Sequence, residues 1–127
     1  MKYLLDTHAI IWLIEDSPNM PEKLKDICRN PNNLIFISTI SLWEIAIKIS
    51  LSKLSLKIEL NEFLSIIKNS DIRILQIRDD YLQKLLELPF VHKDPFDRLI
   101  VTTALTENLT IITIDENIQK YNVTWIW

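Results

Sequence analysis

Short apolar runs alternate along this chain with longer segments whose hydrophobic residues recur at helical spacing. The short runs are rich in Leu and Ile without strict alternation, which is typical of strands buried on both faces. Strands are predicted at residues 2–5, 34–37, 72–77, 110–114 and 123–127, and helices at residues 7–15, 21–29, 39–51, 60–68, 79–88 and 94–108. This alternation, without repeats or linkers, favours one α/β domain over residues 1–127, built as a central parallel sheet with helices on both faces.

Two aspartates directly follow predicted strands. Asp6 follows the first strand and Asp115 follows the fourth. In open α/β sheets, ligands bind at the carboxyl ends of strands, so both carboxylates are expected at the same edge. Asp97 is the third residue of the helix that begins at Pro95, with Asp94 as its predicted N-cap. Asp97 reaches the same edge only if the fold brings that helix start close to it.

Glu44 occupies an unfavourable place for a carboxylate. At helical spacing it falls inside an apolar stripe of the predicted helix at residues 39–51, formed by Ile40, Trp43, Ile47 and Leu51. A carboxylate there needs compensation, either in a capping box with Ser41, in an ion pair with Lys48 one turn on, or from a bound cation. A second apolar face of the same helix contains Leu42, Ile45 and Ile49. One of the two faces is therefore available to a partner chain.

Each aspartate also has a purely structural explanation. Asp6 and Asp94 suit the N-caps of the helices that follow them, and whether Asp94 is also an accessory ligand stays open. Asp97 would be a favourable charge near a helix N-terminus, and Asp115 would begin a turn. If the aspartates and Glu44 converge, they repel one another unless a hard cation such as Mg²⁺ or Mn²⁺ binds them. Neutralising Glu44 or Asp97 is then expected to leave the stability of the metal-free protein unchanged or to raise it.

The remaining candidate ligands do not form a cluster. His8 and His92 are isolated in the sequence, so ordinary, partly exposed histidines are expected and no zinc site is predicted. The single cysteine, Cys28, excludes an intramolecular disulfide and fits a reducing interior. No apolar run is long enough to span a bilayer. A soluble cytoplasmic protein is therefore expected.

Two features of the composition limit the function classes. The chain contains no glycine, which excludes the glycine-rich loops of P-loop and dinucleotide-binding folds, because their backbone must approach the phosphate closely. Turns must then use Asn, Asp, Ser and Pro. The net charge of −3 argues against a general nucleic-acid coat protein, although setting aside four metal-binding acids changes the remainder to +1.

Three stretches place these acids in distinctive local sequences. They are Leu4-Leu5-Asp6-Thr7-His8, Ser41-Leu42-Trp43-Glu44-Ile45-Ala46-Ile47-Lys48, and His92-Lys93-Asp94-Pro95-Phe96-Asp97-Arg98-Leu99-Ile100 followed by Thr113-Ile114-Asp115. Together they resemble the PIN-domain ribonucleases, in particular the VapC toxins of toxin–antitoxin pairs, over essentially the whole chain. The resemblance implies a catalytic, metal-binding set of acids with two threonines that orient it. The acids are Asp6, Glu44, Asp97 and Asp115, and the threonines are Thr7 and Thr113.

The resemblance further implies metal-dependent hydrolysis of RNA, with Mg²⁺ or Mn²⁺ as cofactor and products that carry a 5′-phosphate and a 3′-hydroxyl. Arg98 and Lys48 are candidates to contact the phosphate backbone, and an ion pair with a neighbouring acid is the favoured role of Lys48. A homodimer and inhibition by a small VapB-type antitoxin are implied as well. The sequence departs from the family where a glycine often follows the middle motif, near residues 51–54, so the turn there is not defined.

Two other function classes fit parts of the pattern. A metal-free, PIN-like module that only binds a partner would need a broken set of acids, whereas this set is whole. A phosphoryl-accepting receiver domain would need paired acids after the first strand and a lysine after the last strand. The chain has only Asp6 at the first position and no such lysine.

Overall fold

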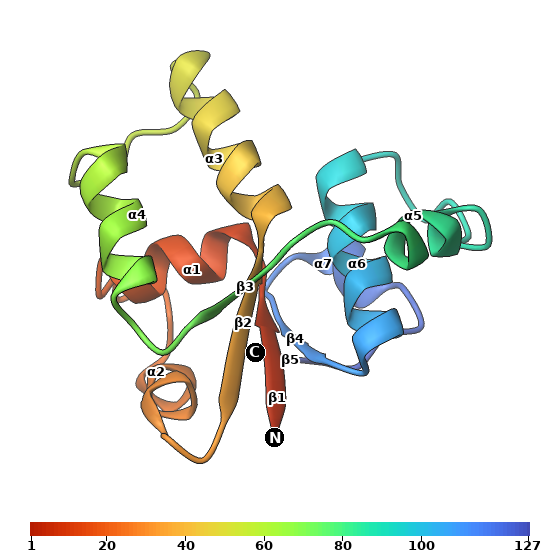
Figure 1. The fold of residues 1–127 in the computed structure, drawn as a ribbon, viewed down its shortest axis with the longest axis horizontal. Coiled ribbons are helices and arrows are strands. Elements are labelled where there is room, and N and C mark those ends of the chain that lie inside the picture. The colour runs from red at the N-terminus through yellow and green to blue at the C-terminus, as the bar shows by residue number, and fades with distance from the viewer.

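A five-stranded parallel sheet separates two layers of helices (Figure 1). The computed structural model describes all 127 residues. The strands are β1 Lys2–Leu5, β2 Leu34–Ser38, β3 Arg73–Leu75, β4 Thr110–Ile112 and β5 Trp125–Ile126. They lie in the order β3-β2-β1-β4-β5, and every neighbouring pair is parallel. The predicted parallel sheet is confirmed.

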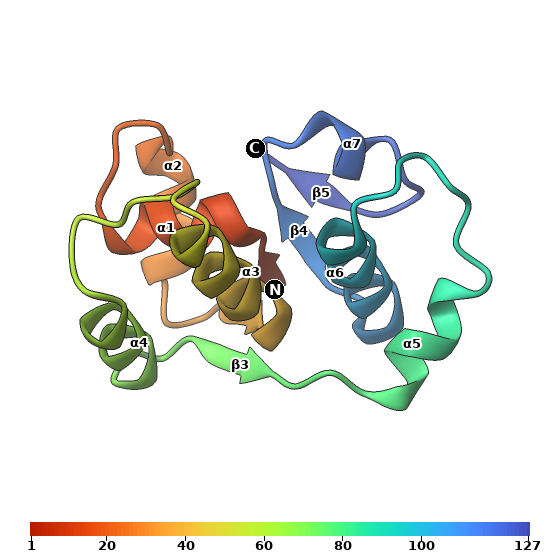
Figure 2. The same ribbon diagram turned by 90° about the horizontal axis from the view of Figure 1, so that it is seen from above.

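Helices cover both faces of this sheet, as predicted. They are α1 Thr7–Ile14, α2 Glu22–Arg29, α3 Thr39–Ser50, α4 Leu60–Lys68, α5 Asp79–Leu85, α6 Pro95–Glu107 and α7 Glu116–Gln119. Figures 1 and 2 show α1 to α4 on one side of the sheet and α5 to α7 on the other. The pattern of apolar residues does not predict α7, because one short turn carries too few hydrophobic positions to show a period. None of the helices is both long and apolar enough to cross a membrane.

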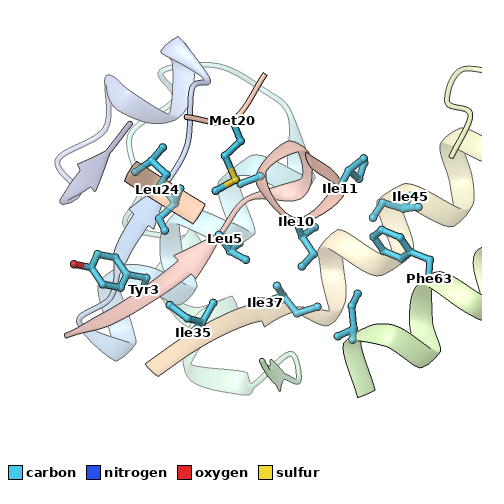
Figure 3. Packing of buried hydrophobic residues seen from close by; sticks show 13 residues of the cluster. Tyr3, Leu5, Ile10, Ile11, Met20, Leu24, Ile35, Ile37, Ile45 and Phe63 are labelled. Atoms are coloured by element: carbon cyan, nitrogen blue, oxygen red, sulfur yellow. The ribbon is translucent and has the colours of Figure 1, made fainter. Parts of the chain in front are cut away.

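Alternate residues of the central strand point to opposite faces of the sheet. Tyr3 and Leu5 belong to the buried cluster that α1, α2 and α4 cover, whereas Leu4 belongs to the cluster on the α6 side. In Figure 3, Leu5 and Ile37 of the neighbouring strand point toward Ile10 of α1. Burial on both faces explains why the strands are continuous apolar runs, and each such side chain contributes about 1.5–3 kcal/mol.

The turn that the missing glycine left undefined uses a serine. Ser52, after α3, adopts a left-handed backbone with φ 56°. Asn108 at the C-terminus of α6 has φ 53°, and its N–H donates to the carbonyl of Ala104. Asp16 is the third such residue, with φ 50°. Left-handed conformations are tolerated by Asn and Asp better than by most residues, so Ser52 is the least suited of the three.

Both apolar faces predicted for α3 are present: Leu42, Ile45 and Ile49 pack on the core, and the other face is largely exposed beyond Ile40. Ile40 is buried at 3% exposure, but Trp43 and Leu51 are 55% and 57% exposed. Figure 1 shows the reason: α3 starts at the carboxyl end of β2 and projects beyond the sheet, so its outer part has no sheet face to cover. The helix buries Glu44 and Ile45 instead. The prediction that Glu44 is buried is therefore confirmed, although its surroundings differ from the predicted stripe.

Candidate active site at the carboxyl edge of the sheet

The fold brings Asp6 and Asp115 to the edge where strand order reverses. β1 lies between β2 and β4, with Leu5 paired to Ile37 on one side and to Ile112 on the other. Asp6 is the next residue after Leu5, and its N–H donates to the carbonyl of Ile112 at 3.2 Å. The chain leaves β1 toward β2, while β4 lies on the opposite side. This edge is therefore the topological switch point at which α/β sheets bind ligands.

A small hollow of about 70 Å³ opens at this edge and has no hydrophobic lining. Its lining residues are Asp6, Thr7, His8, Glu44, Lys48, Asp94, Asp97 and Asp115. All four predicted acids therefore line one hollow, and Asp94 lines it as well. α6 makes this possible because its N-terminus lies near the edge, and α6 also packs against α3, which carries Glu44.

Asp6 caps a helix and faces the hollow at the same time. Its side chain is 3% exposed, and Oδ1 accepts from the backbone N–H of Ala9 at 2.8 Å, which caps α1. Oδ2 accepts from the hydroxyl of Thr113. Burial raises the pKa of the Asp6 carboxyl, and these two hydrogen bonds oppose the increase. The capping explanation and the site explanation of Asp6 do not exclude each other.

Glu44 is compensated by two partners. The side chain of Glu44 is 5% exposed, and it accepts from the Thr7 hydroxyl at 2.6 Å and from the Lys48 ammonium at 2.6 Å. The hydrogen bond to Glu44 raises the pKa of Lys48 above its ordinary value. The predicted ion pair is confirmed, and the capping box with Ser41 is wrong, because the side chain of Ser38 caps α3. Ser41 Oγ lies instead 3.1 Å from the Thr7 hydroxyl oxygen.

Asp97 is held by its own helix start and by a histidine. Asp94 is the N-cap of α6, as predicted, and accepts from the Asp97 backbone N–H at 2.9 Å. His92 Nε2 lies 3.0 Å from Asp97 Oδ2. Burial raises the pKa of the Asp97 carboxyl to about 6; the hydrogen bond to His92 opposes this, and the charges of Asp94, Asp115 and Glu44 add to it. The acids are close enough for their charges to affect one another.

Asp115 and Thr113 connect the last acid to the first. Asp115 Oδ1 accepts from the backbone N–H of Asn117 at 2.8 Å and of Ile118 at 3.2 Å, so Asp115 caps α7. The Thr113 hydroxyl accepts from the Asp115 backbone N–H at 3.0 Å and donates to Asp6. The two threonines predicted to orient acids, Thr7 and Thr113, thus each donate to one of the four acids.

The donor set of this hollow fits a hard divalent cation. Carboxylate oxygens are the ligands that Mg²⁺ and Mn²⁺ prefer. The hollow is lined by five carboxylate groups, one lysine, Lys48, and one histidine, His8. In this conformation no three of the side chains are placed to ligate one ion together. Each of the four predicted acids is engaged by protein donors, and Lys48 supplies the positive charge. Lys48 is 36% exposed, so its side chain contacts solvent as well as Glu44.

The structure contradicts the predicted role of Arg98. The side chain is 5% exposed, and its guanidinium donates to the carbonyls of Pro89 at 2.9 Å and Leu88 at 3.2 Å, and to the Tyr121 hydroxyl at 3.1 Å. The Phe90 ring covers it, with its centroid 4.0 Å from the guanidinium carbon. A side chain fixed inside the protein in this way does not contact a substrate phosphate.

Sequence reasoning also missed the environment of His92. His92 is partly exposed, as predicted, but it is not isolated, because it lies between Asp97 and Tyr121, with Nδ1 2.9 Å from the Tyr121 hydroxyl. The side chain of His92 is 15% exposed. Its position just before the cap of α6 was a local signal that it lies near Asp97. No local signal indicates Tyr121, which the fold brings in from 29 residues away.

Comparisons with known proteins agree with this architecture. The PIN domain family model matches residues 3–123 of the chain. VapBC2 from Rickettsia felis bound to a promoter DNA fragment contains a chain with 24% identity and a TM-score of 0.75, covering 99% of this chain and 98% of that one. A chain of DNA-bound VapBC from Salmonella typhimurium has 17% identity and a TM-score of 0.70, covering 99% of this chain and 97% of that one. A chain of FitAcB from Neisseria gonorrhoeae has 18% identity and a TM-score of 0.68, covering 98% of this chain and 96% of that one. Identities this low show a shared fold. No curated protein sequence gives a significant match.

Proposed function

The chain belongs to the PIN domain family, and on that basis we propose that it is a metal-dependent endoribonuclease, the VapC-type toxin of a toxin–antitoxin pair. The observation that carries the proposal is the set of carboxylates around one polar hollow at the switch point of the sheet: Asp6, Glu44, Asp94, Asp97 and Asp115. Five buried or half-buried acids at one place are electrostatically unfavourable without a cation, as the raised pKa of Asp97 indicates. Such an arrangement is typical of a site built for chemistry.

Asp6, Glu44, Asp97 and Asp115 would hold Mg²⁺ or Mn²⁺ in this hollow. When bound, the cation supplies a water of lowered pKa and neutralises negative charge on the phosphate. The chain's own donors fix the acids beforehand: the Thr113 hydroxyl holds Asp6 and the Thr7 hydroxyl holds Glu44. Rigid support of this kind reduces the reorganisation that binding requires.

The reaction that this site would perform is hydrolysis of an RNA phosphodiester. Water attacks phosphorus, the bond to the 3′ oxygen breaks, and the leaving 3′ oxygen takes up a proton. The products are then a 5′-phosphate and a 3′-hydroxyl. Lys48 is the lysine on the hollow, and it becomes available to the phosphate backbone once a cation takes over the charge of Glu44. The alternative of a non-catalytic interaction module has no comparable support, because no member of the acid set is missing.

The assignment as a toxin rests on the relatives of this fold. The solved structures that match the chain include complexes described as VapBC and FitAcB. We infer a cytoplasmic homodimer that a small VapB-type antitoxin inhibits. The outer side of α3, where Trp43 and Leu51 are 55% and 57% exposed, offers apolar surface for one of these contacts.

The proposal is tested by incubating the purified protein, free of antitoxin, with total RNA and Mg²⁺ or Mn²⁺, and mapping the new 5′ ends. Cleavage that requires the metal, stops with chelator and leaves 5′-phosphates is expected from the wild type. Asp6→Asn and Asp97→Asn should not cleave, whereas Glu62→Gln, an exposed acid on α4, should cleave as the wild type does. Cleavage that persists in chelator, or in the Asp97→Asn protein, would contradict the metal mechanism.

A further inference from the structure

A chain of hydrogen bonds runs from a buried arginine to the carboxylate of Asp97. The Arg98 guanidinium donates to the Tyr121 hydroxyl oxygen at 3.1 Å. That oxygen lies 2.9 Å from His92 Nδ1, and His92 Nε2 lies 3.0 Å from Asp97 Oδ2. Arg98 and Asp97 are neighbours in sequence, yet the connection passes through two side chains from elsewhere. One of these, Tyr121, follows α7, and the other, His92, precedes α6.

Donor and acceptor capacities favour one direction for this chain. A guanidinium has only donors, so the Tyr121 oxygen accepts from Arg98 and has its own O–H left to donate. That O–H reaches His92 Nδ1 at 2.9 Å and the His92 carbonyl at 3.5 Å, and the shorter distance favours Nδ1 as its acceptor. In that arrangement Nδ1 carries no proton, and the N–H at Nε2 donates to Asp97.

Arg98 is fixed firmly enough to anchor the chain. Its other N–H groups donate to the carbonyls of Leu88 and Pro89, and the Phe90 ring lies over it. The guanidinium forms no ion pair with any acid. Hydrogen bonds through Tyr121 and His92 link this buried charge to Asp97. Burial of an arginine without a carboxylate partner is costly, and here the three hydrogen bonds and the Phe90 ring offset that cost.

We propose that Arg98, Tyr121 and His92 are positioning residues that hold Asp97 Oδ2 and leave Oδ1 to the hollow. This inference rests on the proposed function, because it assigns the chain a role in cation binding. Histidine–carboxylate pairs behind a metal site commonly change metal affinity by about 10- to 100-fold. Arg98 thus acts on the site from behind Asp97 and not by contact with the substrate.

Tyr121→Phe tests the proposal, because it removes the O–H that orients His92 and leaves the ring volume unchanged. We expect Mn²⁺ to bind this variant about tenfold more weakly than the wild type in calorimetric titrations. The matched control is Tyr81→Phe, another buried tyrosine, whose hydroxyl donates to Glu107 at 2.9 Å away from the hollow. The control should lose a similar hydrogen bond and similar thermal stability, while its Mn²⁺ affinity stays within twofold of the wild type.

A double-mutant cycle shows whether Tyr121 acts through His92. In a His92→Ala background, Tyr121→Phe should have no further effect on Mn²⁺ affinity. A readout without metal comes from nitrogen-15 spectra of the histidine rings in chelator at pH 8, which should show His92 with its proton on Nε2. Equal Mn²⁺ affinity of wild type and Tyr121→Phe, or a proton on Nδ1, would overturn the inference and leave the proposed function intact. A wild type that binds no Mn²⁺ would overturn the proposed function, while the spectra would still test the hydrogen-bond chain.

Discussion

Asp97→Asn should make the metal-free protein more stable at neutral pH. In the folded protein the pKa of Asp97 is raised from 3.8 to about 6, first by burial and then by the charges of neighbouring acids. The folded state therefore binds the proton more tightly than the unfolded state. The favourable contribution of this proton is fully present below about pH 3.8, falls as the pH rises toward 6, and is absent above it. Asparagine keeps a carbonyl oxygen for the hydrogen bond from His92 and never ionises.

The size of the effect follows from the shift. A difference of about two pKa units corresponds to about 2–3 kcal/mol of unfolding free energy at pH 8. The side chain of Asp97 is 17% exposed, so solvent screens this cost only in part. For a chain of this length the gain corresponds to an increase of about 5–10 °C in melting temperature. At pH 4 the two proteins should differ little, because the folded wild-type side chain is then almost wholly protonated and the pH is close to the unfolded pKa of 3.8.

Urea denaturation of both proteins in chelator, from pH 4 to pH 8, measures this difference directly. The unfolding free energy of the variant should rise relative to that of the wild type between pH 4 and pH 6, and the difference should stay constant above that range. The control is Asp80→Asn, which replaces an exposed acid that pairs with Arg78 on the surface. This variant should show no such gain in stability. The electrostatic argument would be refuted if Asp97→Asn were less stable than the wild type at pH 8, or if the difference in unfolding free energy between the two proteins were the same at every pH.

Further predictions concern other parts of the chain. Glu44→Gln should lower metal-free stability by about 1–2 kcal/mol in thermal melts, contrary to the expectation from sequence, because it leaves Lys48 without its partner at 2.6 Å. Ser52→Gly should raise unfolding free energy by about 0.5–1 kcal/mol in urea titrations, since φ is 56° there. Mn²⁺ at a hundredfold excess over its Kd should stabilise the wild type by about 2.7 kcal/mol, and Asp6→Asn should lose most of that gain. Expression of the wild type should arrest bacterial growth, and expression of Asp6→Asn should not.

The fold was largely predictable because the apolar runs of the strands and the residues that start helices are both local signals in the sequence. Continuous apolar runs identified the strands, and the cap and proline at Asp94 and Pro95 identified the start of α6 within a residue. α3 was the exception, since periodicity does not show how far a helix extends past the sheet it starts from. Its outer residues Trp43 and Leu51 are apolar and exposed. Periodicity predicts which residues share a face and leaves open what that face contacts.

Placement of the acids was predictable to the same degree, whereas their partners were not. Asp6 and Asp115 follow strands, so the sheet alone brings them together. The ion pair of Glu44 with Lys48 follows from helical spacing. The contact between His92 and Tyr121 depends on how the segment after α7 packs against the loop before α6, and no pattern along the sequence encodes that packing. For the same reason the buried position of Arg98 was missed.

The central claim is that the four acids form one cation site, and Mn²⁺ binding measured by electron paramagnetic resonance tests it most directly. The signal of free Mn²⁺ falls as the ion binds, so titration of chelator-treated protein gives the number of sites and their Kd. We predict that Asp6→Asn, Glu44→Gln, Asp97→Asn and Asp115→Asn each weaken binding at least tenfold, while Glu62→Gln binds as the wild type does. Wild-type affinity in all four variants, or no binding by the wild type at millimolar Mn²⁺, would contradict the claim.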